Sequence, residues 1–293
     1  SELTQTTPVG PSVSLFSCIT GNPVPPLSDM AFLRILTFNI WFSKHEMVKR
    51  MEAICSIIAD ESPDIVALQE MTDAHWQLCW KHSAMRAYHW SEPPRGVGYY
   101  TMLGSRAPFV APPARLPFRG SRMGRDLLFA KIQPRAAELP PLVIGTSHLE
   151  SLDFAEERRN QILESLAALE EYVDTDLIFC GDTNIDERLD GEVSLPGSWQ
   201  DAWSVLQPED PGFTFDVRRN LMMARVDDWA RSNRVRLRFD RFWTNLAHYA
   251  ATEVKIEGDA PLKSTEIWPS DHFGLLLTLA PRVEPSLNES LDL

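Results

Sequence analysis

The chain has 293 residues and a mass of 33.2 kDa, which is enough for one large domain or two small ones. A hydrophobic content of 44% and a charged content of 24% are typical of a soluble globular protein, and no apolar run approaches the roughly 20 residues that span a membrane. The net charge of −13 argues against a polyanionic partner unless basic residues gather in one place.

The two ends of the chain differ in composition from the middle. Residues 1–31 are rich in Ser, Thr, Pro and Gly without a sustained period, and they predict a flexible N-terminal segment. Residues 281–293 predict a flexible tail for the same reason. No repeat or long linker interrupts residues 32–280, so we expect these to form one domain.

Apolar strands alternate with amphipathic helices in the first part of this domain. Residues 32–40 (FLRILTFNI) predict a strand, and residues 64–70 (DIVALQE) predict a second one. A helix is predicted between them from four residues at helical spacing, Met47, Met51, Ile54 and Ile58. Trp76 and Trp80, four residues apart, are expected to pack on a further helix.

The same alternation continues towards the C-terminus. Residues 142–150 (LVIGTSHLE) and 176–184 (DLIFCGDTN) predict strands. The helix between them shows apolar residues at Ile162, Leu166 and Leu169. Three later strands lack long helices between them: 212–217 (GFTFDV), 235–245 (VRLRFDRFWTN) and 271–280 (DHFGLLLTLA). The pattern predicts a mixed α/β fold with antiparallel pairing towards its end.

The four cysteines are scattered and form no Cys-x-x-Cys pair: Cys18, Cys55, Cys79 and Cys180. Cys55 falls in a helical pattern and Cys180 ends an apolar strand, so both are predicted to be buried. We expect neither a disulfide framework nor a structural zinc site. This usage indicates a reducing location, nuclear or cytoplasmic.

Basic residues concentrate in two segments of this acidic chain. Residues 95–125 hold six arginines and no acid, and residues 218–241 hold eight more. Arginine binds phosphate groups through two parallel hydrogen bonds, so each segment could form a phosphate-binding wall. A solvated surface without function is the alternative explanation, and both remain open at this point.

Polar residues that could take part in catalysis or binding stand at the ends of five predicted strands: Asn39, Glu70, His148, Asp182 with Asn184, and Asp271 with His272. Strand ends along one rim of a sheet are where α/β proteins usually build their sites. Each residue alone has a structural explanation, such as a helix cap, a turn or a core histidine. Five together indicate a functional site.

The residue types limit the chemistry of that site. Carboxylates with carboxamides and few histidines make an oxygen-rich site that favours Mg²⁺ or Mn²⁺ over zinc. The sequence contains no elbow serine, no Walker loop and no GxGxxG motif after a strand. The pattern suits hydrolysis of a phosphate ester, in which a carboxylate activates water while Asn and His donate to phosphoryl oxygens.

Six motifs resemble those of the endonuclease/exonuclease/phosphatase superfamily, in that superfamily's order: TFN, LQE, TSHLES, GDTN, RFDR and SDHFGLL. The resemblance covers residues 32–280 and implies a four-layer α/β sandwich, with two central mixed sheets flanked by helices. TSHLES, ERRNQ, GDTN and LRFDR are most similar to the tyrosyl-DNA phosphodiesterase 2 family.

This resemblance implies a DNA-repair activity. The enzyme would hydrolyse the bond between a tyrosine side chain and a DNA 5′-phosphate, as left by a trapped topoisomerase II, and leave a 5′-phosphate. The implied partners are DNA with a 5′-tyrosyl adduct on a single-stranded end or overhang, and the topoisomerase II-derived peptide. The implied cofactor is Mg²⁺, with Mn²⁺ as an alternative, and the implied protein is a monomer without a membrane partner.

The resemblance also assigns roles to individual residues. Glu70 and Asp271 would bind the metal, and Asp182 would orient or deprotonate the attacking water. The other catalytic residues would be Asn39, His148 and Asn184 on phosphate oxygens, and His272 with Asp240 as its carboxylate partner. Five residues would bind substrate: Tyr99, Phe215, Ser147, Arg125 and Arg238.

Three positions depart from the family pattern. Trp41 stands where vertebrate members have Asp, and Asn-x-Trp is similar to sphingomyelinase-like members. Asp186 stands where a basic residue would contact DNA. Phe215 stands where a Trp would pack against the terminal nucleotide, and a Phe ring offers a smaller stacking face.

Two alternatives follow from these departures. One is a different phosphodiesterase activity on the same fold, such as an AP endonuclease, an exonuclease or a sphingomyelinase-like enzyme. The other is a catalytically silent binding module, against which the complete set of polar strand ends argues.

Overall fold

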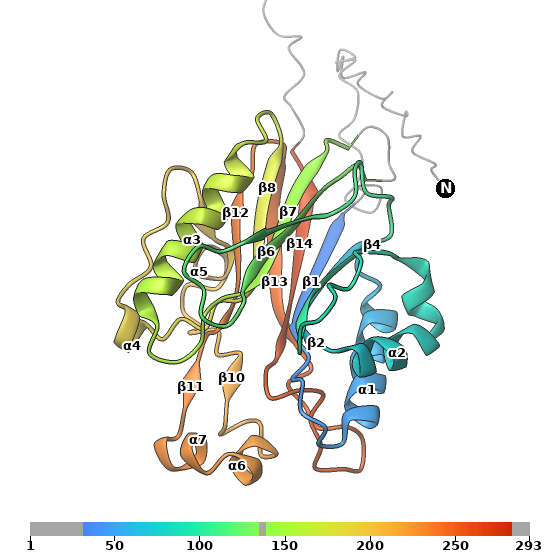
Figure 1. Ribbon diagram of the computed structural model, residues 1–293, viewed down its shortest axis with the longest axis vertical. Helices are drawn as coiled ribbons and strands as arrows, with labels where there is room; N and C mark the ends of the chain where they lie inside the picture. Colours follow the sequence, from blue (N-terminus) through green and yellow to red (C-terminus); the bar gives the residue numbers. More distant parts are fainter. Residues whose placement is uncertain (1–31, 135–138, 283–293) are drawn as a thin grey trace, which may run out of the picture. The chain divides into compact units, whose positions relative to one another are not determined.

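A computed structural model describes residues 32–134 and 139–282, so the expected flexible segments lie outside the described residues apart from 281 and 282. Two six-stranded sheets pack face to face, and helices cover their outer faces (Figure 1). The predicted four-layer α/β sandwich is therefore confirmed. Among the described helices, none combines the length and apolar content needed to cross a membrane.

The first sheet has the strand order β13-β14-β1-β2-β4-β3. β1 and β2 pair in parallel, and the other neighbours pair antiparallel. Its strands are β1 (Leu33–Asn39), β2 (Ile65–Met71), β3 (His89–Trp90), β4 (Tyr100–Ser105), β13 (Tyr249–Glu257) and β14 (Gly274–Pro281). Its outer face is covered by α1 (Met47–Glu61), α2 (Asp73–Lys81) and the short helix η2 (Ser83–Ala87).

The second sheet has the order β5-β6-β7-β8-β12-β9, with β7 and β8 parallel. Its strands are β5 (Ala114–Pro117), β6 (Asp126–Ile132), β7 (Leu142–His148), β8 (Asp176–Asp182), β9 (Gln200–Asp201) and β12 (Asp240–Asn245). α3 (Ala155–Glu170) covers its outer face, with Ile162, Leu166 and Leu169 in the same apolar cluster as residues of β7 and β8. The antiparallel pairing predicted for the late strands is confirmed.

Strand alternation explains how one sequence fills several apolar layers. In β1, Ile35 belongs to the core between the two sheets, whereas Leu36 and Phe38 pack with α1. In β8, Ile178 belongs to the same central core, whereas Phe179 packs with α3. Because successive side chains point to opposite faces, a continuous apolar run serves a strand that is covered on both sides.

A small arm projects from the lower edge of the sandwich in Figure 1. It consists of β10 (Phe215–Asp216), β11 (Arg236–Leu237), α6 (Met223–Val226) and α7 (Asp228–Asn233). α4 (Glu187–Asp190) contacts α3, and α5 (Ala202–Leu206) packs against β12 and β13. The strand predicted at 235–245 is thus two strands: β11 pairs with β10, while β12 pairs with β8.

Three cysteines lie in the described part of the chain: Cys55, Cys79 and Cys180. All three are buried and free. The predicted burial of Cys55 and Cys180 is confirmed, and Cys18 lies outside the described residues.

Candidate active site

The polar strand ends meet at one edge of the sandwich. Asn39 ends β1 and Glu70 lies near the end of β2, while His148 and Asp182 end β7 and β8. Asp240 begins β12, which runs antiparallel to β8, and its Cα is paired directly with that of Asp182. Strand direction and register therefore bring together residues that are far apart in the sequence.

Asp182 is the centre of the cluster. Its Oδ2 accepts a hydrogen bond from Asn39 Nδ2 (2.8 Å), which crosses from one sheet to the other. Its Oδ1 accepts the backbone N–H of Asn184 (2.9 Å). Burial alone would raise the pKa of Asp182, but His272 and these two hydrogen bonds lower it below its usual value. Asp182 is therefore a fixed carboxylate, ionised at neutral pH.

Asn184 adopts a left-handed backbone conformation with a φ of 50°. This conformation is uncommon for residues other than Gly, although Asn tolerates it better than most. It lets the backbone N–H of Asn184 turn back to Asp182, while its Nδ2 donates to the Leu149 carbonyl (3.1 Å). The loop after β8 is thereby tied to the loop after β7.

The His148 imidazole is neutral, and its tautomer follows from its partner. Burial lowers the pKa of His148 to about 3. Its Nδ1 lies 2.9 Å from Arg125 Nη1, and because a guanidinium only donates, Nδ1 must accept. Nε2 then carries the hydrogen, 3.4 Å from Asp182 Oδ2. His148 thus presents a neutral N–H donor to the site.

The second imidazole, His272, carries a positive charge. Its Nδ1 lies 2.8 Å from Asp240 Oδ2, and its Nε2 lies 3.8 Å from Asp182 Oδ2. Burial opposes the charged form, yet the surrounding carboxylates Asp240, Asp182 and Asp271 raise the pKa of His272 well above its usual value. The predicted pairing of His272 with Asp240 is present in the structure.

Glu70 occupies a strained position in β2. Its φ is 62°, and the pairing of β2 with β4 shifts register between Leu68 and Met71. This irregularity holds its carboxylate at the strand end, where Oε2 accepts the backbone N–H of Phe42 (2.9 Å). Burial and the negative charge of Asp271 raise the pKa of Glu70 to about 7.

Two groups of side chains could hold a cation. Asp182, Asp240 and His272 offer ligand atoms within 4.8 Å of one another, but Asp182 and Asp240 already accept hydrogen bonds from Asn39 and His272. Glu70 and Asp271 instead form a pair of like charges without a basic side chain in a hydrogen bond to either. Among the described residues, Asp271 has one hydrogen-bond partner, the Ser270 hydroxyl at 3.0 Å from Oδ1, and Glu70 has one, the Phe42 N–H, so each carboxylate keeps one oxygen available. Two hard oxygen donors fit a Mg²⁺ ion.

Aromatic rings border the cluster on two sides. Tyr99 lies 5.9 Å from the His148 ring and stacks on Phe42 at 5.0 Å, and the Arg125 guanidinium lies 5.1 Å from its centroid. Phe215 meets the His272 ring edge-on at 5.4 Å. The structure thus places Tyr99, Arg125 and Phe215 beside the cluster around Asp182.

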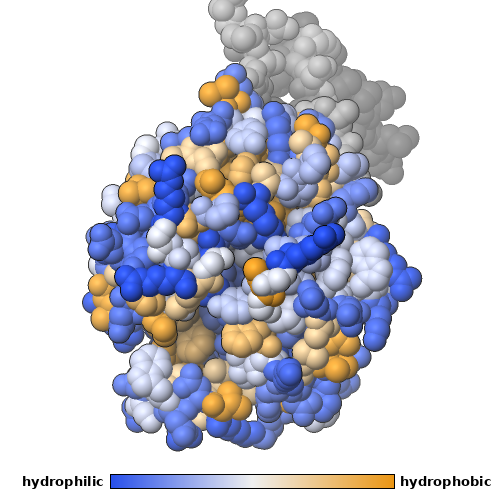
Figure 2. Space-filling view, viewed as in Figure 1, coloured by the Kyte–Doolittle hydropathy of each residue, from blue (hydrophilic) through white to orange (hydrophobic). Residues whose placement is uncertain are grey.

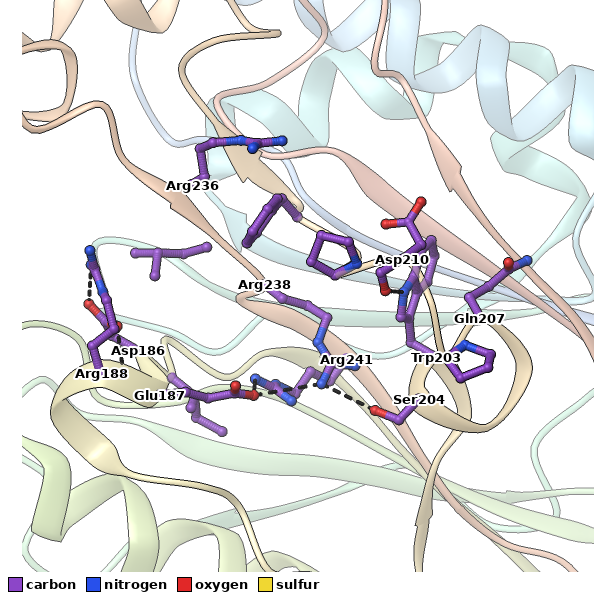
Figure 3. A pocket seen from close by; sticks show the side chains of 15 residues that line it. Asp186, Glu187, Arg188, Trp203, Ser204, Gln207, Asp210, Arg236, Arg238 and Arg241 are labelled. Carbon is purple, nitrogen blue, oxygen red and sulfur yellow. Dashed lines mark hydrogen bonds and ion pairs between the residues drawn. The ribbon is translucent and has the colours of Figure 1, made fainter.

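Two residues expected to bind substrate lie elsewhere. Ser147 is fully buried and its hydroxyl donates to the Asp126 carbonyl (2.8 Å), because it precedes His148 in β7 and points to the opposite face. Arg238 lies in a neighbouring pocket of about 520 Å³, where its Nη1 donates to Asp201 (2.7 Å). Figure 3 shows this pocket, with Arg238 and Arg241 pointing towards Glu187 and Ser204. The substrate-binding roles predicted for Ser147 and Arg238 stay predictions.

The two arginine-rich segments do not form continuous basic walls. In 218–241, six of the eight arginines pair with carboxylates: Arg219, Arg225, Arg231, Arg236, Arg238 and Arg241. Asp186 is likewise paired, with Arg188. Within the two segments, four exposed arginines have no ion pair to another described residue: Arg95, Arg119, Arg218 and Arg234.

Sequence reasoning missed several residues that support the site. Gln69 Nε2 donates to Thr37 (3.0 Å) in its own sheet and to Thr146 (3.1 Å) in the other sheet. The Ser270 hydroxyl donates to the Asn39 carbonyl (2.6 Å). Arg50 is fully buried in α1. A charged residue one position before Met51 in the apolar stripe was a signal that could have identified Arg50.

Comparisons with known proteins agree with this geometry. The model of the endonuclease/exonuclease/phosphatase family matches residues 36–272. The chain is 30% identical over 264 residues to tyrosyl-DNA phosphodiesterase 2 of Rattus norvegicus, covering 87% of this chain and 68% of that protein. It is 27% identical over 287 residues to 5′-tyrosyl-DNA phosphodiesterase of Caenorhabditis briggsae, covering 93% and 76%. The structure of D. rerio TDP2 complexed with single strand DNA product matches with a TM-score of 0.73 and 27% identity, covering 85% of this chain and 99% of that one.

Proposed function

Because the chain belongs to the endonuclease/exonuclease/phosphatase family, as a tyrosyl-DNA phosphodiesterase 2-like member, we propose that it hydrolyses 5′-phosphotyrosyl bonds in DNA and leaves a 5′-phosphate. The observation that carries this proposal is the cluster around Asp182, which holds one ionised carboxylate between a neutral and a charged imidazole. Such a set suits displacement at a phosphodiester by water.

The attacking water would be oriented by Asp182. Asn39 and the backbone of Asn184 fix both of its oxygens, so the carboxylate has one orientation. A carboxylate held in this way can accept a proton from water as the bond to phosphorus forms. Its low pKa keeps it in the accepting form at neutral pH.

The phosphoryl oxygens would be bound by the two imidazoles. His272 offers a charged Nε2–H, and Asp240 holds its ring in position through Nδ1. His148 offers a neutral Nε2–H, because Arg125 occupies its Nδ1. Donors that are already oriented need no reorganisation when negative charge develops on the phosphoryl group.

Glu70 and Asp271 would hold a magnesium ion, with manganese as a substitute. When bound, the ion would offset charge on the phosphate. Burial together with the charge of Asp271 disfavours a metal-free, fully ionised pair, which is consistent with a site that gains a cation.

The physiological substrate would be DNA that carries the tyrosine of a trapped topoisomerase II, on a single-stranded 5′ end or overhang. This is supported by the names of the relatives and by the DNA product complex of the D. rerio protein. We further propose a nuclear or cytoplasmic location, supported by three buried, unpaired cysteines in the described chain.

The test uses an oligonucleotide with a 5′-phosphotyrosyl group on a short single-stranded overhang. We expect conversion to a 5′-phosphate in Mg²⁺, none in EDTA, and a loss of more than about a hundredfold for Asp182→Asn, in which no carboxylate can accept the proton. The variant's unfolding midpoint is the control for folding.

A second candidate, a different phosphodiesterase of this fold, follows from Trp41, where vertebrate relatives are expected to have Asp. An abasic duplex and sphingomyelin are therefore assayed in parallel. Cleavage of the abasic duplex or of sphingomyelin, without release of tyrosine, would refute the proposed substrate and leave the proposed metal site standing. Absence of turnover on all three would favour a binding module.

A further inference from the structure

Arg50 makes an unusual set of contacts for a buried cation. Its five N–H groups face five backbone carbonyls, and no carboxylate lies within hydrogen-bond distance. The acceptors are His45 O (2.8 Å) from Nε, Ile40 O (3.0 Å) and Pro269 O (3.4 Å) from Nη1, and Trp41 O (2.9 Å) and Ser43 O (2.7 Å) from Nη2. A guanidinium bonded in this way fixes the backbone around it.

The backbone that Arg50 fixes is the loop that contacts the catalytic side chains. The Trp41 N–H donates to Asn39 Oδ1 (2.9 Å), and the Phe42 N–H donates to Glu70 Oε2 (2.9 Å). Trp41 is held in the left-handed region with a φ of 57°, and its ring lies 4.5 Å from the Arg50 guanidinium carbon. This conformation costs energy in a free loop, so it requires support from its surroundings.

The fifth carbonyl connects Arg50 to the other candidate metal ligand. Pro269 precedes Ser270, whose hydroxyl oxygen lies 2.6 Å from the Asn39 carbonyl oxygen and 3.0 Å from Asp271 Oδ1. One side chain therefore holds both the loop whose Phe42 N–H donates to Glu70 and the segment that leads into Asp271.

We propose that Arg50 is a positioning residue that sets the spacing of Glu70 and Asp271 for a divalent cation, by holding the loop 40–45 and Pro269 in one arrangement. This inference rests on the proposed function only through the presence of that cation site. The planar guanidinium with its five N–H donors is essential to this role, because the ammonium of Lys has three donors and cannot bind all five carbonyls. Its donor geometry is called the fork below.

Two effects of Arg50 on a bound cation oppose each other, and this makes the proposal testable. Its positive charge near the carboxylates would weaken cation binding, whereas its hold on the loop would strengthen it. Removing the charge alone should tighten binding, and removing the fork should weaken it. Arg50→Met removes both, while Arg50→Lys keeps the charge and loses the fork.

The experiment measures Mn²⁺ binding by electron paramagnetic resonance of the free ion, on the whole chain without DNA. We expect the dissociation constant to rise at least tenfold in both variants, and the Mg²⁺ concentration for half-maximal turnover to rise in parallel. Restoration of most of the turnover at saturating Mg²⁺ would show that the chemistry itself is intact.

Arg158 supplies the matched control. It is also buried in a helix, and it also donates to two backbone carbonyls, Glu150 O (3.0 Å) and Leu152 O (2.7 Å), but it lies in α3 and pairs with Asp190. Arg158→Met should lower the unfolding midpoint while leaving the Mn²⁺ dissociation constant within about twofold.

Unchanged or tighter Mn²⁺ binding in Arg50→Met would overturn the positioning role. If Arg50→Met does not fold, Arg50→Lys is the test, and a wild-type affinity of Arg50→Lys for Mn²⁺ would overturn the positioning role. Wild-type protein that binds Mn²⁺ but releases no tyrosine would refute the proposed substrate and leave this inference standing. Wild-type protein that binds no Mn²⁺ would refute the inference.

Discussion

Three buried histidines differ in charge because their neighbours differ. His272 is surrounded by carboxylates and is charged, and His148 receives a hydrogen bond from an arginine and is neutral. His75, at the start of α2, lies close enough to Arg50 for that charge to act on it, and its Nε2 has no hydrogen-bond partner. A residue type alone therefore does not reveal a role, whereas the nearest charge often does.

His75 predicts how stability depends on pH. Burial first, and then the charge of Arg50, lower the pKa of His75 to about 4 from 6.5. Between these values the unfolded chain protonates His75 and the folded chain does not, so His75 should lower the free energy of unfolding by about 2.5 kcal/mol as pH falls from 6.5 to 4. Urea unfolding at several pH values measures this.

The matched variants are His75→Gln and His89→Gln, since His89 is exposed. His75→Gln should reduce the pH dependence in that window and leave the share of His148, whose pKa is also lowered by burial, whereas His89→Gln should leave it unchanged. Equal slopes for wild type and His75→Gln would contradict the assignment of a buried, neutral His75.

At the scale of elements, the strands and long helices were predictable because their side chains follow a clear period. The segment 235–245 was predicted as one strand, but Phe239 interrupts it. Its carbonyl accepts the backbone N–H of Thr183 (2.8 Å), and its N–H donates to the Thr214 hydroxyl (3.2 Å). The partner strands of β11 and β12 differ, and no local pattern in the sequence encodes which strand will be the neighbour.

The candidate site was predictable to a similar depth. The residues at strand ends were identified because each interrupts an apolar run. Ser147 was predicted to bind substrate, although alternation along β7 places its side chain on the opposite face from His148. The tautomer of His148, by contrast, depends on Arg125, which lies 23 residues away in the sequence and reaches it only in the folded chain.

Gly181 marks the closest approach of β7 and β8. Its φ is 134°, and a Cβ atom there would lie 2.1 Å from the Ser147 carbonyl oxygen. Gly181→Ala should destabilise the fold by about 3 kcal/mol or more, because neither backbone can move without displacing Asp182 or His148. Urea unfolding is the measurement.

Gly98→Ala provides the comparison, since a Cβ atom at Gly98 meets nothing within 4 Å. A Gly181→Ala protein within about 1 kcal/mol of wild type would show that the two strands can separate slightly without penalty.

At the scale of the molecule, the arginine-rich segments do not form a continuous basic face within the described residues, because most of their arginines are paired with carboxylates. Figure 2 shows hydrophilic and hydrophobic residues interspersed across the face drawn there. Most charges of the arginine-rich segments are neutralised locally, which agrees with the net charge of −13. Any electrostatic attraction to DNA should therefore come from a few unpaired arginines.

The salt dependence of DNA binding tests this expectation. If Arg95, Arg119, Arg218 and Arg234 each neutralise one phosphate of a single strand, affinity should fall about 50-fold between roughly 50 and 200 mM salt. The double variant Arg218→Ala, Arg234→Ala should lower the slope of log K against log salt by about 1.4. Fluorescence anisotropy in EDTA measures binding without turnover.

The corresponding control removes two arginines that already pair with Glu266 and Asp228, in Arg225→Ala, Arg231→Ala. This change should alter the slope much less. An equal decrease of the slope of log K against log salt in both double variants would mean that the local ion pairs open when DNA binds.

The hydrogen bond from Asn39 to Asp182 joins the two sheets, and Gln69 joins them again through Thr146. The cluster around Asp182 is therefore formed by residues of both sheets, and it exists only while the two sheets pack against each other in register. Catalytic activity should therefore report on how well the two sheets are packed together. As the denaturant concentration rises, activity should disappear before the far-UV circular dichroism signal. A slight separation of the two sheets would displace the residues of the cluster while the strands and helices are still intact.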